Sequence, residues 1–203
     1  MEFQLLGQVV VSVGGRAVDA GSDRQRCVLV ALAVDISRVV SVQRLTERVW
    51  GEDPPPQARA TLLSYVSRLR QVLADTEIGI VRRAGGYVLE ADPSAVDLHR
   101  FRDLCAQARA GAGDDQRVMR LLEQALALWR GEALTGLGGN WAAAQRDQLH
   151  QERLDAECGL TDVLLRLGHG KELVAGLATR TAAAPLDERV AHQYMLALYR
   201  AGR

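Results

Sequence analysis

The sequence has no apolar run that approaches the ~18 residues of a membrane-spanning helix. Its N-terminus lacks a basic segment followed by an apolar one, so no secretory signal is visible. Cysteine is scarce: Cys27, Cys105 and Cys158 are odd in number, far apart and beside apolar residues, which favours buried, reduced thiols. These absences predict a cytoplasmic protein with no membrane partner.

Motifs for metal binding and catalysis are also lacking. No two of the four histidines have the spacing of a zinc-binding helix, and no Gly-x-Ser-x-Gly elbow occurs. The segment Gly168–Glu172 is not a phosphate-binding loop, because the leading glycine spacing and the Ser or Thr after Lys171 are missing. We therefore expect no enzymatic activity, no metal and no cofactor.

Lysine is almost absent, since Lys171 is the only one and the other basic residues are arginine. The 25 basic side chains are balanced by 25 acidic ones. A nucleic-acid-binding protein needs a local basic patch rather than a net positive charge. The 203 residues are enough for one large domain or two modest ones, each able to bury a core.

Residues 57–73 have the period of an amphipathic helix. The apolar positions recur at spacings of four, three and four: Leu62, Val66, Leu69 and Leu73. The opposite face is small and polar: Ala60, Ser64, Ser67 and Gln71. Arg59 and Arg70 border this face on one side, and Thr61 and Arg68 on the other. The pattern suits a helix that enters the major groove, but a solvated surface helix would share it.

The chain before this helix predicts a small antiparallel sheet and two helices. Segments 3–6 and 9–13 have strand character, and Gly14-Gly15 predicts a turn. Ser22 or Asp23 caps a helix to about Val34, and Ser41 caps a second one over 42–50. A proline-rich loop follows at Glu52–Pro56.

Two arginines, Arg24 and Arg26, fall in the first turn of the first predicted helix. The helix dipole favours acidic residues there, so these cations either meet DNA phosphate or are plain surface residues.

Residues 78–89 predict a hairpin with a basic, glycine-containing tip that includes Arg82, Arg83 and Gly86. Over residues 59–83, five arginines oppose only Asp75 and Glu77, a net charge of +3. The order of two helices, rigid loop, arginine-bordered helix and basic hairpin is that of a winged helix-turn-helix.

From Asp97 onward the pattern is wholly helical, with expected helices at 97–110, 115–130, 140–168, 171–183 and 186–201. Leu128 and Trp129 are expected on the apolar stripe of the second of these. The last three helices fit stacked helix hairpins. The predicted fold class is mainly α with small β-sheets: a winged helix-turn-helix over 1–91, then an all-α helical repeat domain over 92–203.

Five short segments resemble a known family. Ser64–Arg70 and Arg83–Leu89 are similar to the DNA-binding domain of OmpR-type winged-helix regulators. Val40–Leu45, Val49–Pro55 and Val96–Phe101 narrow the match to the Streptomyces antibiotic regulatory protein (SARP) family of transcriptional activators. In this family the winged helix is joined to a bacterial transcriptional activation domain of tetratricopeptide-like helix pairs. Compared with the family, the second domain looks short, as a truncated one would.

The resemblance implies that the third helix enters the major groove while the hairpin wing reaches the minor groove or backbone. Together with the first-turn arginines, the implied DNA-binding residues are Arg24, Arg26, Arg59, Thr61, Ser64, Tyr65, Ser67, Arg68, Arg70, Arg82, Arg83 and Gly86. Because serine discriminates bases weakly, Arg68 or Arg59 is the better candidate for a bidentate contact to guanine. Tyr65 either packs or reaches phosphate through its hydroxyl.

The resemblance also implies the partners. Members of the family bind direct repeats in promoter DNA and recruit RNA polymerase, so we expect duplex DNA, the holoenzyme with its sigma factor and a second protomer on DNA. The expected location is the cytoplasm, on the nucleoid, and the expected target is an antibiotic gene cluster. Two alternatives stay open: a repressor with the same DNA contacts, and a scaffold whose helical repeats bind a protein.

Overall fold

The computed structural model describes residues 2–74, 76–111 and 113–202. Asp75, which entered the charge sum, lies outside the described residues. The chain divides into two compact units. The first contains residues 1–100 and 128–150, and the second contains residues 101–127 and 151–203. The domain boundary at residues 91 and 92 stays a prediction.

The first unit begins with a three-stranded antiparallel sheet. Its strands are β1 (Glu2–Gln4), β2 (Val10–Val13) and β3 (Arg16–Ala17), in the order β1-β2-β3. This confirms the two predicted strands and the turn at Gly14-Gly15, although β1 covers residues 2–4 instead of 3–6 and β2 begins at Val10 instead of residue 9. Phe3, which pairs with Val11 in the sheet, also forms a bridge to Val96, so the sheet is held to the chain just before helix α4.

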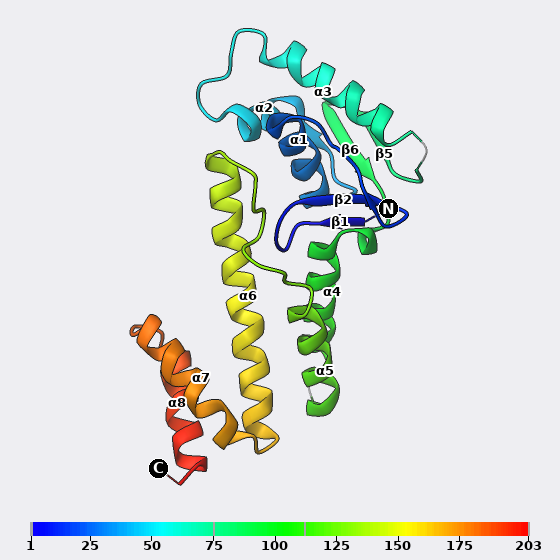
Figure 1. Cartoon of the computed structure of the whole chain (residues 1–203). Coiled ribbons are helices and arrows are strands. Elements are labelled where there is room, and N and C mark those ends of the chain that lie inside the picture. Colours follow the sequence, from blue (N-terminus) through cyan, green and yellow to red (C-terminus); the bar gives the residue numbers. More distant parts are fainter. Residues whose placement is uncertain (1, 75, 112, 203) are drawn as a thin grey trace. The chain divides into compact units, whose positions relative to one another are not determined.

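The three helices and the hairpin follow in the predicted order, and a short strand that was not predicted, β4 (Val40–Ser41), lies between the first two helices (Figure 1). The helices are α1 (Asp23–Val34), α2 (Val42–Trp50) and α3 (Ala58–Val72), and the hairpin strands are β5 (Gly79–Arg83) and β6 (Gly86–Glu90). The second sheet has the order β4-β6-β5. Helix α1 is the centre of the core: every residue from Cys27 to Val34 is buried, and α2, α3 and β6 all contact the helix.

Local signals explain where these helices begin and end. The Ser22 and Ser41 hydroxyls accept hydrogen bonds from the main-chain N–H groups of Gln25 and Arg44, which confirms both caps. Gly51 ends α2 with a φ of 69°, a backbone conformation that favours glycine. Helix α3 begins one residue later than predicted, after Gln57, which makes no side-chain cap.

A buried carboxylate joins distant parts of the first unit. Asp97, at the start of α4 (Asp97–Ala110) after the 3-10 turn η1 (Pro93–Ala95), accepts hydrogen bonds from the N–H groups of Leu5 and Leu6. It also pairs with Arg130. Burial raises the pKa of Asp97, and the two main-chain donors and Arg130 oppose this rise.

Helix α5 (Asp115–Leu126) ends four residues before the predicted position, so Leu128 and Trp129 do not continue its stripe. Beyond the helix the chain turns to run beside the N-terminal segment. The N–H groups of Arg130 and Leu134 donate to the main-chain oxygens of Leu6 and Leu5 at 2.7 and 2.9 Å. The bond to Leu6 takes the place of the helical bond that the N–H group of Arg130 would form with Leu126 if the helix continued.

The second unit is wholly helical in its described residues and has its own core. It contains α5 and parts of α4 and α6 (Asn140–Arg166), with α7 (Gly170–Ala183) and α8 (Glu188–Arg200). Helices α7 and α8 pack side by side (Figure 1), around a core of Cys158, Leu165, Leu177, Val190 and Ala197. Helix α8 begins at Glu188 rather than 186, because the Asp187 carboxylate caps it by accepting from the N–H groups of Arg189 and Val190.

None of the helices in the described ranges is long and apolar enough to cross a membrane.

Candidate nucleic-acid interface

Helix α3 presents the face that its periodicity predicted. Leu62, Val66, Leu69 and Leu73 are all at most 2% exposed, which confirms the buried stripe. The residues of the opposite face are all exposed: Ala60, Ser64, Ser67 and Gln71. Small side chains on an exposed face let the helix backbone approach a groove closely.

The three arginines of α3 have different surroundings. Arg59 and Arg68 are exposed, and neither pairs with a carboxylate within the described part of the chain. Arg70 instead donates through Nε to the main-chain oxygen of Ile80 at 2.7 Å. Its guanidinium also lies 5.7 Å from the centre of the Tyr87 ring. Arg59 and Arg68 are therefore available to an anion, whereas Arg70 connects α3 to the hairpin.

Tyr65 packs against an aromatic neighbour. Its ring is stacked with that of Trp50, with centroids 6.2 Å apart and planes 13° from parallel. The Arg24 guanidinium lies over the Trp50 ring, 5.9 Å from its centroid. The stacking supports the packing alternative for Tyr65. Contact of its hydroxyl with phosphate stays a prediction. Thr61, on the same flank of the helix as Arg68, is half-buried.

The first turn of α1 is less basic than its two arginines suggested. Asp23 lies in the same turn and pairs with Arg26. The Asp23 carboxylate interacts favourably with the helix dipole and neutralises the charge of Arg26. Arg24, stacked on Trp50, is the one whose charge remains.

The wing is a tight hairpin between β5 and β6. Arg83 pairs with Gly86 across a two-residue turn, and Gly85, the second turn residue, has a φ of +84°, a conformation that favours glycine. Arg82 is exposed, while Arg83 forms an ion pair with Glu90, which lies just outside the segment used for the charge sum. The wing therefore offers one unpaired arginine and one paired arginine.

Gly86 is buried rather than displayed at the tip. A Cβ atom built on it would lie 2.0 Å from the carbonyl oxygen of Val40, far inside contact distance. The glycine is required where β4 and β6 approach each other, which pairing of Ser41 with Gly86 brings about. A contact between Gly86 and DNA stays a prediction.

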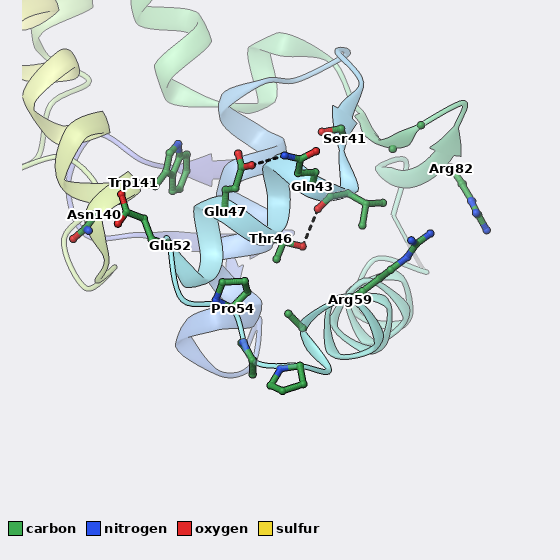
Figure 2. A pocket seen from close by; sticks show the side chains of 17 residues that line it. Ser41, Gln43, Thr46, Glu47, Glu52, Pro54, Arg59, Arg82, Asn140 and Trp141 are labelled. Carbon is green, nitrogen blue, oxygen red and sulfur yellow. Dashed lines mark hydrogen bonds between the residues drawn. The ribbon is translucent and has the colours of Figure 1, made fainter.

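A cavity of about 1210 Å³ lies between α2, the 51–56 loop, the start of α3 and the hairpin. Figure 2 shows Arg59 and Arg82 at one end, with Glu47, Glu52 and Trp141 at the other. At the basic end, Arg59 of α3 and Arg82 of the wing line the same cavity. Basic side chains of this kind position a protein on DNA by contacting phosphate groups. Of the predicted DNA-binding residues, the structure thus brings Arg59, Arg82 and Gly86 to one cavity.

Arg48 is a residue whose importance the sequence did not reveal. Its guanidinium donates to the Ala31 carbonyl oxygen at 3.0 Å, pairs with Asp35 at 2.6 Å and lies 5.2 Å from the centre of the Trp141 ring. It thereby joins α1, α2 and the start of α6. Its place in the last turn of α2, where the dipole favours cations, was the one visible signal.

The cysteines have the inert character that their apolar neighbours predicted. All three are free and buried. Burial raises the pKa of Cys27 to about 12, against the opposing charge of Arg48, and that of Cys105 to about 11. Within the described ranges, no group of three or more His, Cys, Asp or Glu side chains could hold a metal ion.

Comparison with known proteins agrees with this architecture. Residues 18–89 match the family described as "Transcriptional regulatory protein, C terminal", and residues 96–203, more than half of the chain, match "Bacterial transcriptional activator domain". The regulatory protein DnrI of Streptomyces peucetius is 31% identical over 215 residues, which cover all of this chain and 79% of DnrI.

Two longer proteins are also similar. The regulatory protein AfsR of Streptomyces griseus is 39% identical over 205 residues, and the chain spans all of its own length but only 21% of AfsR. The solved structure titled "Mycobacterium tuberculosis EmbR in complex with low affinity phosphopeptide" superimposes with a TM-score of 0.92 at 30% identity, covering 100% of this chain and 55% of that one. Two matched domains in this order, together with a relative covered over most of its length, show that the chain belongs to the SARP family of transcription regulators, with an OmpR-type winged helix followed by a bacterial transcriptional activator domain.

Proposed function

We propose that this DNA-binding regulator activates transcription by binding direct repeats upstream of promoters and recruiting RNA polymerase holoenzyme, including its sigma factor. Its target would be a secondary-metabolite gene cluster of the antibiotic type, and it would act in the cytoplasm on nucleoid DNA. The observation that carries the proposal is the exposed, small-residue face of α3 with the unpaired Arg59 and Arg68 at its borders.

The proposal assigns different tasks to the arginines. Arg68, at the edge of the exposed face, would read guanine through a bidentate contact, and Ser64 and Ser67 would add weak discrimination. Arg59 and Arg82, which line the basic end of one cavity, would hold a phosphate group. Since direct repeats place the same site twice, a second protomer would occupy the next repeat.

The surface that would meet polymerase is the Glu52–Pro56 loop. All five of its residues are exposed, and its three consecutive prolines restrict the backbone. A rigid, exposed loop can bind a partner at a low cost in conformational entropy. The family resemblance is the second reason to place polymerase here.

Footprinting and transcription in vitro on promoter DNA from the native genome test the proposal. We expect protection of two direct repeats, an upstream shift of the polymerase footprint and an increase in transcript when the protein is added. A decrease in transcript with the same protected repeats would establish the repressor instead. Affinity for duplex DNA that does not change with salt would refute binding through arginine–phosphate contacts.

A variant that combines Arg59→Ala and Arg82→Ala provides the matched test of the basic end. Each lost phosphate contact should reduce the salt slope of log K by about 0.9. Arg117→Ala with Arg120→Ala, on α5, removes two exposed arginines of the other unit and should leave the slope unchanged. If Arg68 and Arg83 can be lost together without loss of function, the scaffold alternative holds instead.

A further inference from the structure

The second unit contains a cavity of about 720 Å³ that DNA binding does not use. Residues of α4, α5, α6 and α8 line it, and all belong to the second unit. Its floor is apolar, with buried Phe101, Cys105, Leu122 and Ala156. A volume of this size, with several buried apolar side chains, is typical of sites that bind small molecules, and charged side chains also line this cavity.

A glycine in the cavity wall indicates that the space is not a by-product of tight helix packing. Gly159 lies in the interior of α6, where glycine costs stability relative to alanine. A Cβ atom on Gly159 would meet Leu122 Cδ1 at 3.5 Å, an ordinary contact distance. Alanine would therefore fit, and no close helix approach requires the glycine. Because Gly159 has no side chain, it leaves more room in the cavity than any other residue would.

The rim carries one arginine that no carboxylate neutralises. Arg102 makes a bidentate contact with Glu152, with both bonds at 2.8 Å. Arg189 binds Asp162 at 2.7 Å, and Arg166 binds Asp115 at the same distance. Arg109, one helical turn beyond Cys105 on α4, has no ion pair among the residues that the structure describes. Arg109 is exposed and lines the same cavity as Cys105, so its charge is available to a molecule bound there.

We propose that this cavity binds a small molecule with an apolar body and a single carboxylate, whose carboxylate pairs with Arg109. The apolar body would replace water against Phe101 and Leu122, and the exposed guanidinium would attract the anionic end. A wholly polar ligand would lose its hydration against the apolar floor without compensation. This inference does not depend on the DNA contacts proposed above.

Two probes test the inference on the whole chain: the fluorescent anion 8-anilinonaphthalene-1-sulfonate, and 2-naphthoate as its competitor. We expect saturable, one-to-one fluorescence binding to the folded protein, displaced by 2-naphthoate. The neutral analogue 2-naphthalenemethanol should displace it about tenfold less well, because it lacks the charge that Arg109 recognises.

Two variants locate the site. Gly159→Leu should abolish binding of the fluorescent anion by filling the cavity. Gly176→Leu, on an exposed part of α7 with open space around it, is the matched control and should bind as the wild type does. Arg109→Ala, an exposed substitution that leaves the core intact, should remove the preference for naphthoate over its alcohol.

The same variants should bind promoter DNA as the wild type does, which separates this inference from the proposed function. If Arg109→Ala keeps the preference for naphthoate, the inference is wrong, whether or not Gly159→Leu folds. Loss of fluorescence in Arg59→Ala instead of Arg109→Ala would also overturn it, because the anion would then occupy the cavity of the first unit.

Discussion

The Nε atom of Arg70 donates a hydrogen bond to the main-chain oxygen of Ile80 at 2.7 Å, which ties helix α3 to the first strand of the wing. Arg70 was among the residues predicted to contact DNA, and this bond gives it a structural task. The two DNA-contacting elements of a winged helix must keep their relative placement if both are to engage one duplex. An intramolecular bond of this kind contributes to that placement before DNA arrives.

Arg70→Ala should therefore destabilise the fold by about 1–2 kcal/mol, because an arginine–carbonyl bond and a contact with the Tyr87 ring are lost. Arg59 lies on the same exposed side of α3 and has no hydrogen-bond or ion-pair partner among the described residues, so Arg59→Ala should change stability by less than about 0.5 kcal/mol. Urea unfolding of both variants measures the difference. Equal stability of the two variants would contradict the structural task of Arg70.

Arg68→Ala should weaken specific DNA binding by about 1–3 kcal/mol, as loss of a good base contact does. Binding to unrelated DNA should change much less. Fluorescence anisotropy with operator and scrambled duplexes at one salt concentration measures both. Arg120→Ala on α5 is the control for removal of an exposed arginine. If Arg68→Ala binds its operator like the wild type, α3 has been assigned the wrong task.

The ion pair between Arg83 and Glu90 predicts opposite effects of its two partners. Arg83→Ala should weaken binding to all sequences alike, because a wing arginine contacts the backbone rather than bases. Glu90→Gln should strengthen binding to all sequences, because it frees the guanidinium and removes a negative charge. Anisotropy on scrambled duplexes at low and high salt checks both changes. A Glu90→Gln variant that binds no better would mean that Arg83 does not meet DNA.

Gly86→Ala should destabilise the first unit by about 1–3 kcal/mol or more, because the new Cβ atom would collide with the Val40 carbonyl oxygen. Gly79→Ala, in the neighbouring strand, is the control: its Cβ atom would meet only Val81 Cγ2, at 3.8 Å. Thermal unfolding of the two variants provides the comparison. A Gly86→Ala protein as stable as the wild type would show that β4 and β6 can move apart.

Cys27 should resist alkylation in the folded protein. Its pKa rises from 9.0 to about 12, so the thiolate fraction near neutral pH falls about a thousandfold. Its contribution to stability should be complete below pH 9 and lost as the pH rises toward 12, since the unfolded thiol ionises first. Iodoacetamide labelling followed by peptide mass spectrometry, with and without urea, tests the protection. Equal labelling rates would contradict the burial of this thiol.

The helices and the hairpin could be predicted because their signals are local. These signals are the serine caps, the glycine stop, the apolar spacing of α3 and the glycine-containing hairpin of the wing. They act between residues close in sequence, and each is found as predicted. The family pattern, read from short motifs in the right order, was predicted for the same reason and is confirmed.

Other features depend on partners that lie far away along the chain. From the periodicity alone, helix α5 was predicted to extend to residue 130. In the structure it ends at Leu126, and the chain beyond it forms main-chain hydrogen bonds with Leu5 and Leu6. The sequence does not distinguish arginines that have a partner from those that have none. Ile80 binds Arg70 and Glu90 binds Arg83, whereas Arg59 and Arg68 have no such partner among the described residues. The sequence by itself shows which side chains are charged. Whether that charge is already satisfied is decided by packing, which brings together residues that no sequence period connects.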